Sequence, residues 1–275
     1  MRTLFVSDLD GTLLHSEGCL SDRTRRVLGR VTEAGALFTY ATARSVHSAR
    51  IVTQGWRPSL PVIVYNGVMI LGEKAETPLV FNTFSAEERG WLRGSFKEAK
   101  ISPLVYAFIE GRERVSWRED RTNKGTEAYL AKRQNDRRLR PCMEEEALFS
   151  GEAFYYTCIG TREELAPLYE RLERWGRCRL TFQRELYGQG EWWLEVMPYQ
   201  ATKAHAALQL KEWLGCERLV VFGDGLNDLP LFQVADACYA MENGAQALKE
   251  RATGILKKND EDGVALWLEE HLLNV

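Results

Sequence analysis

The sequence predicts an α/β fold in which a parallel-sheet core is interrupted by an inserted α+β domain. Three observations carry this prediction. Short apolar runs alternate with helical patterns over residues 1–80, a stretch richer in charged and aromatic residues follows over residues 81–190, and the alternation resumes over residues 191–275. We therefore expect residues 1–80 and 191–275 to form the core and residues 81–190 to form the inserted domain.

The first 80 residues are predicted to alternate between strands and helices. Strands are expected at residues 4–7, 37–41 and 62–65, and helices at residues 21–35 and 45–52. The first helix is favoured by Ser21 as an N-cap, by apolar residues at three- and four-residue spacing, and by Gly35 at its end. This rhythm is typical of a parallel sheet with right-handed crossovers.

The two later segments differ in pattern. In the inserted segment, helices are expected at residues 85–100 and 161–175, and strands at residues 104–109, 114–117 and 153–159. Such a mixture favours an antiparallel sheet covered by helices. In the last segment, strands are expected at residues 192–197, 219–222 and 237–240, and helices at residues 201–214, 229–234, 245–251 and 264–273. The core pattern therefore returns after the insertion.

Charge and composition exclude several classes of protein. The net charge is −3 and the isoelectric point is near 5.9, so nothing in the overall charge attracts nucleic acid or an anionic membrane. The basic stretch at residues 132–140 favours a solvated helix face or loop, with a phosphate-attracting surface as the alternative. No apolar run approaches the roughly 20 residues of a membrane-spanning helix.

The expected compartment is the cytoplasm. The chain begins Met1-Arg2 and enters a strand directly, without the apolar region and cleavage site of a secretory signal. Its six cysteines show no C-x-x-C spacing, and reduced thiols are the default in such a chain.

Two aspartates at the end of the first strand form the most informative motif. Asp8 and Asp10 lie two residues apart, so their side chains point to the same side while the chain stays extended. Open α/β sheets bind ligands at the carboxyl ends of their strands, and paired carboxylates attract a hard cation such as Mg2+. Gly11 then allows a sharp departure from the strand. Taken alone, Asp-Leu-Asp-Gly would also fit an ordinary turn.

Four motifs follow one another along the chain. They are residues 8–14 (DLDGTLL), residues 40–44 (YATAR), Lys203 near a helix start, and residues 223–228 (GDGLND) after an apolar strand. In this order they resemble the motifs of the haloacid dehalogenase-like (HAD) hydrolase superfamily, most closely its Cof-type phosphatases. The resemblance spans nearly the whole chain. It implies a Rossmann-like core with a large C2-type (type IIB) cap domain inserted between the second and third motifs.

The resemblance implies a Mg2+-dependent phosphatase that works through an aspartyl-phosphate. Asp8 would attack phosphorus, which splits one difficult step into two. Asp10 would protonate the departing alkoxide and then activate water. Dehalogenases of the superfamily lack this acid, whereas its phosphatases and phosphomutases keep it. The expected Mg2+ ligands are Asp8, the main-chain carbonyl of Asp10, and Asp224. Asp228 is expected behind them, where it would orient Lys203.

The second and fourth motifs are expected to bind the phosphoryl group as well. Thr42 would donate a hydrogen bond to a phosphoryl oxygen, and Ala43 and Asn227 are expected to contribute beside it. Arg44 fits a phosphate contact and a surface charge equally well.

The third motif departs from the family pattern. Lys203 would bring positive charge to the phosphate, but both glycines of the usual Gly-Val-Ser-Lys-Gly are replaced in Gln200-Ala201-Thr202-Lys203-Ala204. Lys211 is the alternative if this register is wrong. Candidate cap residues suited to a sugar phosphate are Trp117, Arg118, Tyr155 and Arg184. For the aromatic ones, a place in the core of the cap is the favoured interpretation.

The predicted function is hydrolysis of small phosphorylated metabolites, with sugar phosphates as the expected substrates. A phosphatase dedicated to one pathway, of the phosphosucrose or mannosylglycerate-phosphate type, would use the same motifs. A non-enzymatic phospho-receiver would need Asp8 but not Asp10. A sugar-binding or transferase module with a metal-binding Asp-x-Asp would leave Lys203 unexplained. We expect a monomer or weak homodimer that binds neither nucleic acid nor membrane.

Overall fold

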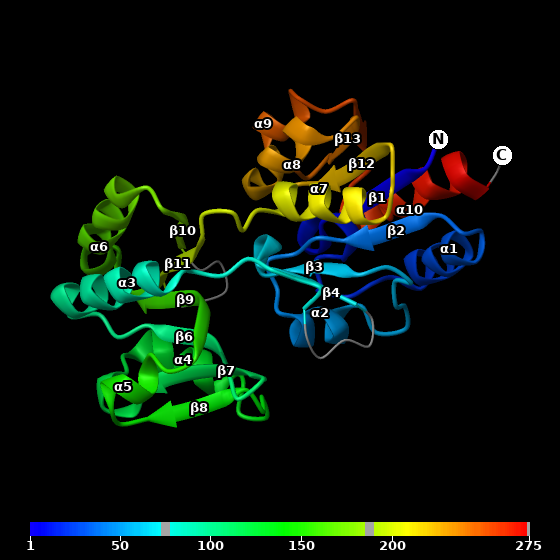
Figure 1. The fold of residues 1–275 in the computed structure, drawn as a ribbon. Coiled ribbons are helices and arrows are strands. Elements are labelled where there is room, and N and C mark those ends of the chain that lie inside the picture. Colours follow the sequence, from blue (N-terminus) through cyan, green and yellow to red (C-terminus); the bar gives the residue numbers. More distant parts are fainter. Residues whose placement is uncertain (73–77, 185–189, 274–275) are drawn as a thin grey trace. The chain divides into compact units, whose positions relative to one another are not determined.

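The structure is a computed structural model that describes residues 1–72, 78–184 and 190–273 (Figure 1). It divides into two compact units. The first comprises Met1–Phe81 and Ala201–Val275, and the second comprises Asn82–Gln200. The first holds a parallel sheet and the second a largely antiparallel one, which confirms the predicted fold class. Among the described residues, no helix has the length and apolarity to cross a membrane.

A five-stranded parallel sheet organises the first unit, in the order β14-β13-β12-β1-β2. Its strands are β1 (Thr3–Ser7), β2 (Leu37–Tyr40), β12 (Arg218–Gly223), β13 (Ala237–Met241) and β14 (Gly254–Leu256). The strand order reverses at β1, which lies between β2 and β12. Open α/β sheets bind ligands outside the carboxyl ends of the strands at such a reversal.

Helices pack on both faces of this sheet because β1 is apolar on both sides. They are α1 (Asp22–Glu33), α2 (Val46–Val52), α7 (Lys203–Trp213), α8 (Leu229–Val234), α9 (Gln246–Lys249) and α10 (Gly263–Leu268). Leu4 and Val6 share a buried cluster with α7, α8 and α9. Phe5 points to the other face, where its ring centroid lies 6.1 Å from that of Trp267 in α10.

One predicted parallel strand has a different partner. β3 (Val62–Val64) pairs antiparallel with β4 (Met69–Leu71), and β4 pairs with β5 (Val80–Phe81). A single parallel bridge, between Ala41 and Ile63, links β3 to the end of β2. The parallel prediction is therefore wrong for most of β3, because the tight turn after it brings β4 alongside as an antiparallel partner.

The second unit is built on a six-stranded sheet, in the order β10-β11-β9-β6-β7-β8. Its strands are β6 (Leu104–Ile109), β7 (Arg112–Arg118), β8 (Leu139–Cys142), β9 (Glu152–Gly160), β10 (Cys178–Arg184) and β11 (Trp192–Pro198). Its helices are α3 (Ala86–Ala99), α4 (Lys124–Ala131), α5 (Glu145–Leu148) and α6 (Arg162–Trp175). Apolar residues of α3 and α6 share a buried cluster with alternate strand residues, among them Val105, Tyr156 and Leu194.

The sequence places residues 192–197 in the core, and the structure corrects this. β11 lies between β9 and β10 in the sheet of the second unit, which extends to Gln200 rather than ending at residue 190. An alternating strand carries no signal of which sheet it joins, because either sheet buries one of its faces. The closing helices are also shorter than expected: α9 is a single turn, and α10 changes at Glu269 into a wider turn.

Candidate active site

Asp8 lies at the carboxyl end of β1. Its N–H donates to the carbonyl of Phe222 at 2.9 Å, which continues the pairing of β1 with β12 by one residue. Its side chain is only 8% exposed. Burial raises the pKa of Asp8 to about 8; Lys203 opposes this, while the charges of Asp228 and Asp224 add to it.

Lys203 is the cation of this site. It begins α7, directly after Thr202, whose hydroxyl accepts from the N–H of His205 at 3.0 Å and caps the helix. The Lys203 ammonium lies 2.7 Å from Asp8 Oδ1 and 2.7 Å from Asp228 Oδ1. Burial acts to lower the pKa of Lys203, but the charges of Asp228 and Asp8 outweigh it and raise the pKa above its ordinary value. Lys211 instead pairs with Asp236 at 3.5 Å.

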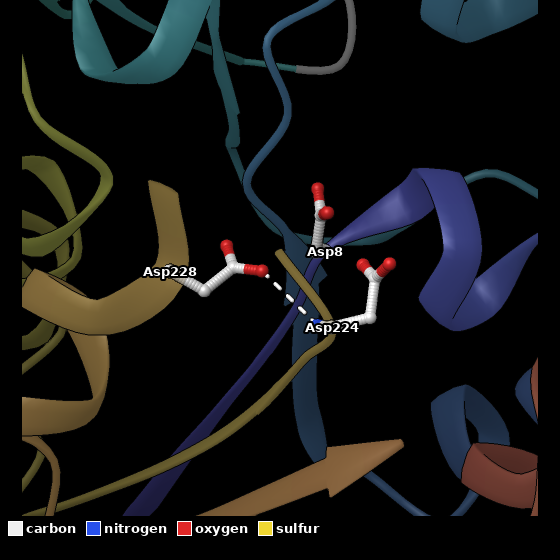
Figure 2. A group of neighbouring side chains, drawn as sticks. All are labelled: Asp8, Asp224 and Asp228. Atoms are coloured by element: carbon white, nitrogen blue, oxygen red, sulfur yellow. Dashed lines mark hydrogen bonds between the residues drawn. The ribbon is translucent and has the colours of Figure 1, made fainter. Parts of the chain in front are cut away.

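Three aspartates converge here (Figure 2). Asp8 follows β1, Asp224 follows β12, and Asp228 ends the short turn before α8. Asp228 Oδ2 accepts from the N–H groups of Asp224 at 3.2 Å and Gly225 at 3.1 Å. Burial raises the pKa of Asp224 to about 6, although a 2.9 Å hydrogen bond from Thr12 Oγ1 acts to lower it. The loop therefore fixes Asp228 toward Lys203 and leaves Asp224 beside Asp8.

The donor set fits a divalent cation. One carboxylate oxygen from each of Asp8, Asp224 and Asp228 lies within 4.8 Å of the other two. Asp228 already accepts three hydrogen bonds, so Asp8 and Asp224 are the better placed to coordinate. Oxygen ligands with excess negative charge are what Mg2+ prefers, and here three carboxylates lie together while one ammonium pairs with two of them.

The turn after Asp8 is held by two asparagines that sequence reasoning missed. Gly11 has φ +74° within the wide turn Leu9–Leu13. Asn243 Nδ2 donates to the Gly11 carbonyl at 2.7 Å, and Asn259 Nδ2 donates to the Leu14 carbonyl at 2.9 Å. The signal that points to Asn243 is its place just after β13, at the same edge of the sheet as Asp8 and Asp224.

The side chain of Asp10 points to Arg44. Arg44 Nε donates to Asp10 Oδ2 at 2.7 Å, and Nη2 donates to Oδ1 at 2.6 Å. The hydrogen bond with Asp10 raises the pKa of Arg44, so the guanidinium remains charged. The two interpretations of Arg44 from sequence, a phosphate contact and a surface charge, both omit this pairing. It joins two loops that are 34 residues apart in the chain.

The remaining phosphate-binding candidates lie in the same unit. Thr42 is fully buried at the end of β2, and its hydroxyl oxygen accepts from the Arg44 N–H at 3.1 Å. That bond does not use the hydroxyl hydrogen, which can be donated elsewhere. Ala43 and Asn227 are exposed, on the loops after β2 and β12.

The cap candidates lie in the second unit. Tyr155 is 2% exposed, and its ring packs edge-on to Tyr106 with centroids 5.4 Å apart, as expected for a residue in the core of that unit. Arg118 binds both carboxylate oxygens of Asp120 at 2.8 Å. Trp117 is half-buried and Arg184 is exposed. The contacts of Tyr155 and Arg118 are thus explained within the second unit.

Comparison with known proteins assigns the chain to a family. A family model of haloacid dehalogenase-like hydrolases matches residues 5–268. The chain belongs to this family. One relative of this HAD-like hydrolase is 5-amino-6-(5-phospho-D-ribitylamino)uracil phosphatase YwtE of Bacillus subtilis, 26% identical over 284 residues that cover 96% of each chain. Pyridoxal phosphate phosphatase YbhA of Escherichia coli is 24% identical, with 97% of each chain covered.

A solved structure supports the same assignment. The crystal structure of a haloacid dehalogenase-like hydrolase from Bacteroides thetaiotaomicron matches with a TM-score of 0.80 at 25% identity, covering 98% of this chain and 99% of that one. The resemblance to Cof-type HAD-like phosphatases is therefore confirmed, and the chain is an enzyme of this class.

Proposed function

We propose that this HAD-like hydrolase is a Mg2+-dependent phosphatase that acts on small phosphorylated metabolites through an aspartyl-phosphate on Asp8. The observation that carries the proposal is the buried Lys203 ammonium, 2.7 Å from both Asp8 and Asp228. A carboxylate nucleophile and a phosphate dianion repel each other, so the reaction needs fixed positive charge beside the nucleophile. Asp228 would hold Lys203 in that position.

Asp8 and Asp224, with the main-chain carbonyl of Asp10, would hold the Mg2+. Both side chains lie at the ends of adjacent strands, and burial together with neighbouring negative charge raises both of their pKa values. A bound Mg2+ would offset the repulsion between Asp8 and the phosphoryl group.

Asp8 would act as the nucleophile, and Asp10 would act first as an acid and then as a base. An Asp8 oxygen bonds to phosphorus while the ester P–O bond breaks, and Asp10 gives its proton to the departing alkoxide. Asp10, now a carboxylate, then takes a proton from the water that attacks the aspartyl-phosphate, which returns Asp8 and inorganic phosphate. Thr42 and Lys203 would bind phosphoryl oxygens throughout, with the Ala43 loop and Asn227 beside them.

Sugar phosphates and other primary alkyl phosphates are the proposed substrate class. The two relatives above are named for a phosphoribityl compound and for pyridoxal phosphate, and both compounds carry phosphate on a primary alcohol. An alkoxide is a poor leaving group without a proton, and Asp10 is the acid that would supply it. The proposal includes the case in which the enzyme acts on only one such ester.

Phosphate release from sugar phosphates, nucleotides, flavin phosphate, pyridoxal phosphate and p-nitrophenyl phosphate, with Mg2+ or with EDTA, tests the proposal. We expect Asp8→Asn to abolish turnover, and Asp10→Asn to lower kcat on alkyl phosphates by about 100-fold or more. Asp22→Asn is the matched control, because the Asp22 side chain is 81% exposed on α1. Full turnover in EDTA or by Asp8→Asn would contradict the proposal. Stable phosphorylation of Asp8 without turnover would instead favour a phospho-receiver.

A further inference from the structure

The Arg44 guanidinium donates hydrogen bonds through its three nitrogens to other residues of the first unit. Nε and Nη2 bind the two carboxylate oxygens of Asp10, and Nη1 donates to Ser48 Oγ at 3.0 Å. A forked guanidinium–carboxylate pair fixes the plane of the carboxylate as well as its position. The direction in which Asp10 points is therefore set by Arg44.

The backbone of Arg44 is anchored as well. Its N–H donates to Thr42 Oγ1 at 3.1 Å, and its carbonyl accepts from the N–H of Tyr65 at 3.0 Å. Tyr65 and Asn66 both have positive φ, 51° and 54°, which side-chain-bearing residues adopt uncommonly. The backbone of Arg44 is thus held by the loop after β2 and by the turn after β3. This limits the positions that its guanidinium can take beside Asp10.

The Asp10 side chain remains accessible from its other edge. It is 51% exposed while paired with Arg44, which is 28% exposed. Each carboxylate oxygen has a second lone pair beyond the one that Arg44 uses. One oxygen can therefore carry a proton toward a substrate while the group stays bound to Arg44.

We propose that Arg44 is a positioning residue for Asp10, and not a ligand of the substrate phosphate. This positioning role rests on the proposed function, because it concerns the proton that Asp10 would deliver to the leaving group. As the ester P–O bond breaks, the proton moves from the Asp10 carboxyl to the leaving oxygen, and Asp10 becomes a carboxylate. The fork that Arg44 makes with Asp10 fixes the plane of that carboxyl group, and so the direction in which its proton can be delivered.

The test compares leaving groups in Arg44→Lys, which keeps a cation but loses the fork. p-Nitrophenolate departs without a proton, whereas the alkoxide of the best alkyl phosphate in the panel needs one. We expect kcat on the alkyl phosphate to fall about 100-fold and kcat on p-nitrophenyl phosphate to fall less than about threefold. KM for both substrates and the inhibition constant of inorganic phosphate should stay within about twofold, because no phosphate contact is lost.

Three further variants sharpen the test. Arg23→Lys is the matched control, since Arg23 pairs with Glu269 on the surface of the same unit. Arg44→Gln, with thermal unfolding followed for both Arg44 variants, separates misfolding from mispositioning. In the double variant, Arg44→Lys should cost nothing further once Asp10→Asn is present.

Two results would overturn the proposal. One is an equal loss of kcat on both substrates. The other is a roughly tenfold rise in KM and in the inhibition constant of phosphate, which would make Arg44 a phosphate ligand. If the wild-type enzyme releases no phosphate from any compound, the proposed function itself is wrong. This measurement is made before any Arg44 variant is prepared.

Discussion

At Lys203, one ammonium serves two buried carboxylates. Its side chain is 1% exposed, and those of Asp8 and Asp228 are 8% and 0% exposed. Removing one partner from such a group leaves uncompensated charge among buried side chains, which costs far more than breaking a surface pair. Lys203 thus contributes to folding as well as to the proposed chemistry.

Lys203→Met is expected to lower the free energy of unfolding by about 3–5 kcal/mol at neutral pH. Lys211→Met removes a lysine from the same helix, but its pair with Asp236 is partly exposed, so we expect a loss below about 1 kcal/mol. Urea unfolding of both variants measures the difference. Equal stabilities would show that Asp8 and Asp228 do not depend on Lys203 for charge compensation.

Among the elements, the turn Leu9–Leu13 places a tight steric constraint on the site. A Cβ on Gly11 would lie 2.2 Å from Asp224 Oδ2, closer than any non-bonded contact allows. With any other residue at this position, the Asp224 side chain would have to move away from the turn after β1. The φ of +74° at Gly11 favours glycine independently.

Gly11→Ala is expected to lower kcat by at least about 100-fold and to raise the Mg2+ concentration for half-maximal activity, because Asp224 must move. Gly35→Ala is the matched control. Its φ is +78°, but a Cβ there meets nothing within 4 Å, so only the cost of the left-handed backbone, roughly 1–2 kcal/mol, applies. Phosphate release across a Mg2+ titration, with urea unfolding of both variants, separates the two effects. If Gly11→Ala kept its activity, Asp224 would not be a ligand.

The sequence predicted those parts of the site that lie at strand ends. Asp8 and Asp224 each follow an apolar run, and parallel strands bring such ends together. The pairing of Asp10 with Arg44 could not be predicted, because it depends on how two irregular loops approach in space. The sequence placed β11 in the wrong sheet for a similar reason. The alternation of its side chains identifies a strand, but it does not show which sheet the strand joins. The ligand and catalytic roles of the site residues stay predictions.

For the whole molecule, the raised pKa values link stability to pH and to metal. The pKa of Asp8 is raised to about 8 and that of Asp224 to about 6, so these two groups bind more protons in the folded protein without metal than in the unfolded chain between about pH 4 and 8. The stability that these groups contribute is present at low pH and is lost as the pH rises through the folded-state values. Mg2+ would compete with those protons.

The gain in melting temperature on adding saturating Mg2+ is therefore expected to be larger at pH 8 than at pH 5.5. At 100 times its dissociation constant a ligand stabilises by about 2.7 kcal/mol, which should raise the midpoint by several degrees. Thermal unfolding in Mg2+ and in EDTA at both pH values measures this. Asp224→Asn should remove most of the gain, and a gain that was the same at both pH values would argue against these two ligands.

The insertion of the second unit has a consequence for how the chain is made. Asp8 leaves the ribosome early, but β12, which must lie beside β1, is completed only at Gly223. The second unit, by contrast, is continuous from Asn82 to Gln200 and needs no later residue for its own sheet. During synthesis it can finish folding while the nascent strand β1 still exposes one unpaired edge and a carboxylate with no ammonium beside it. The candidate active site thus begins with the first strand to be translated and is completed only after the second unit has emerged.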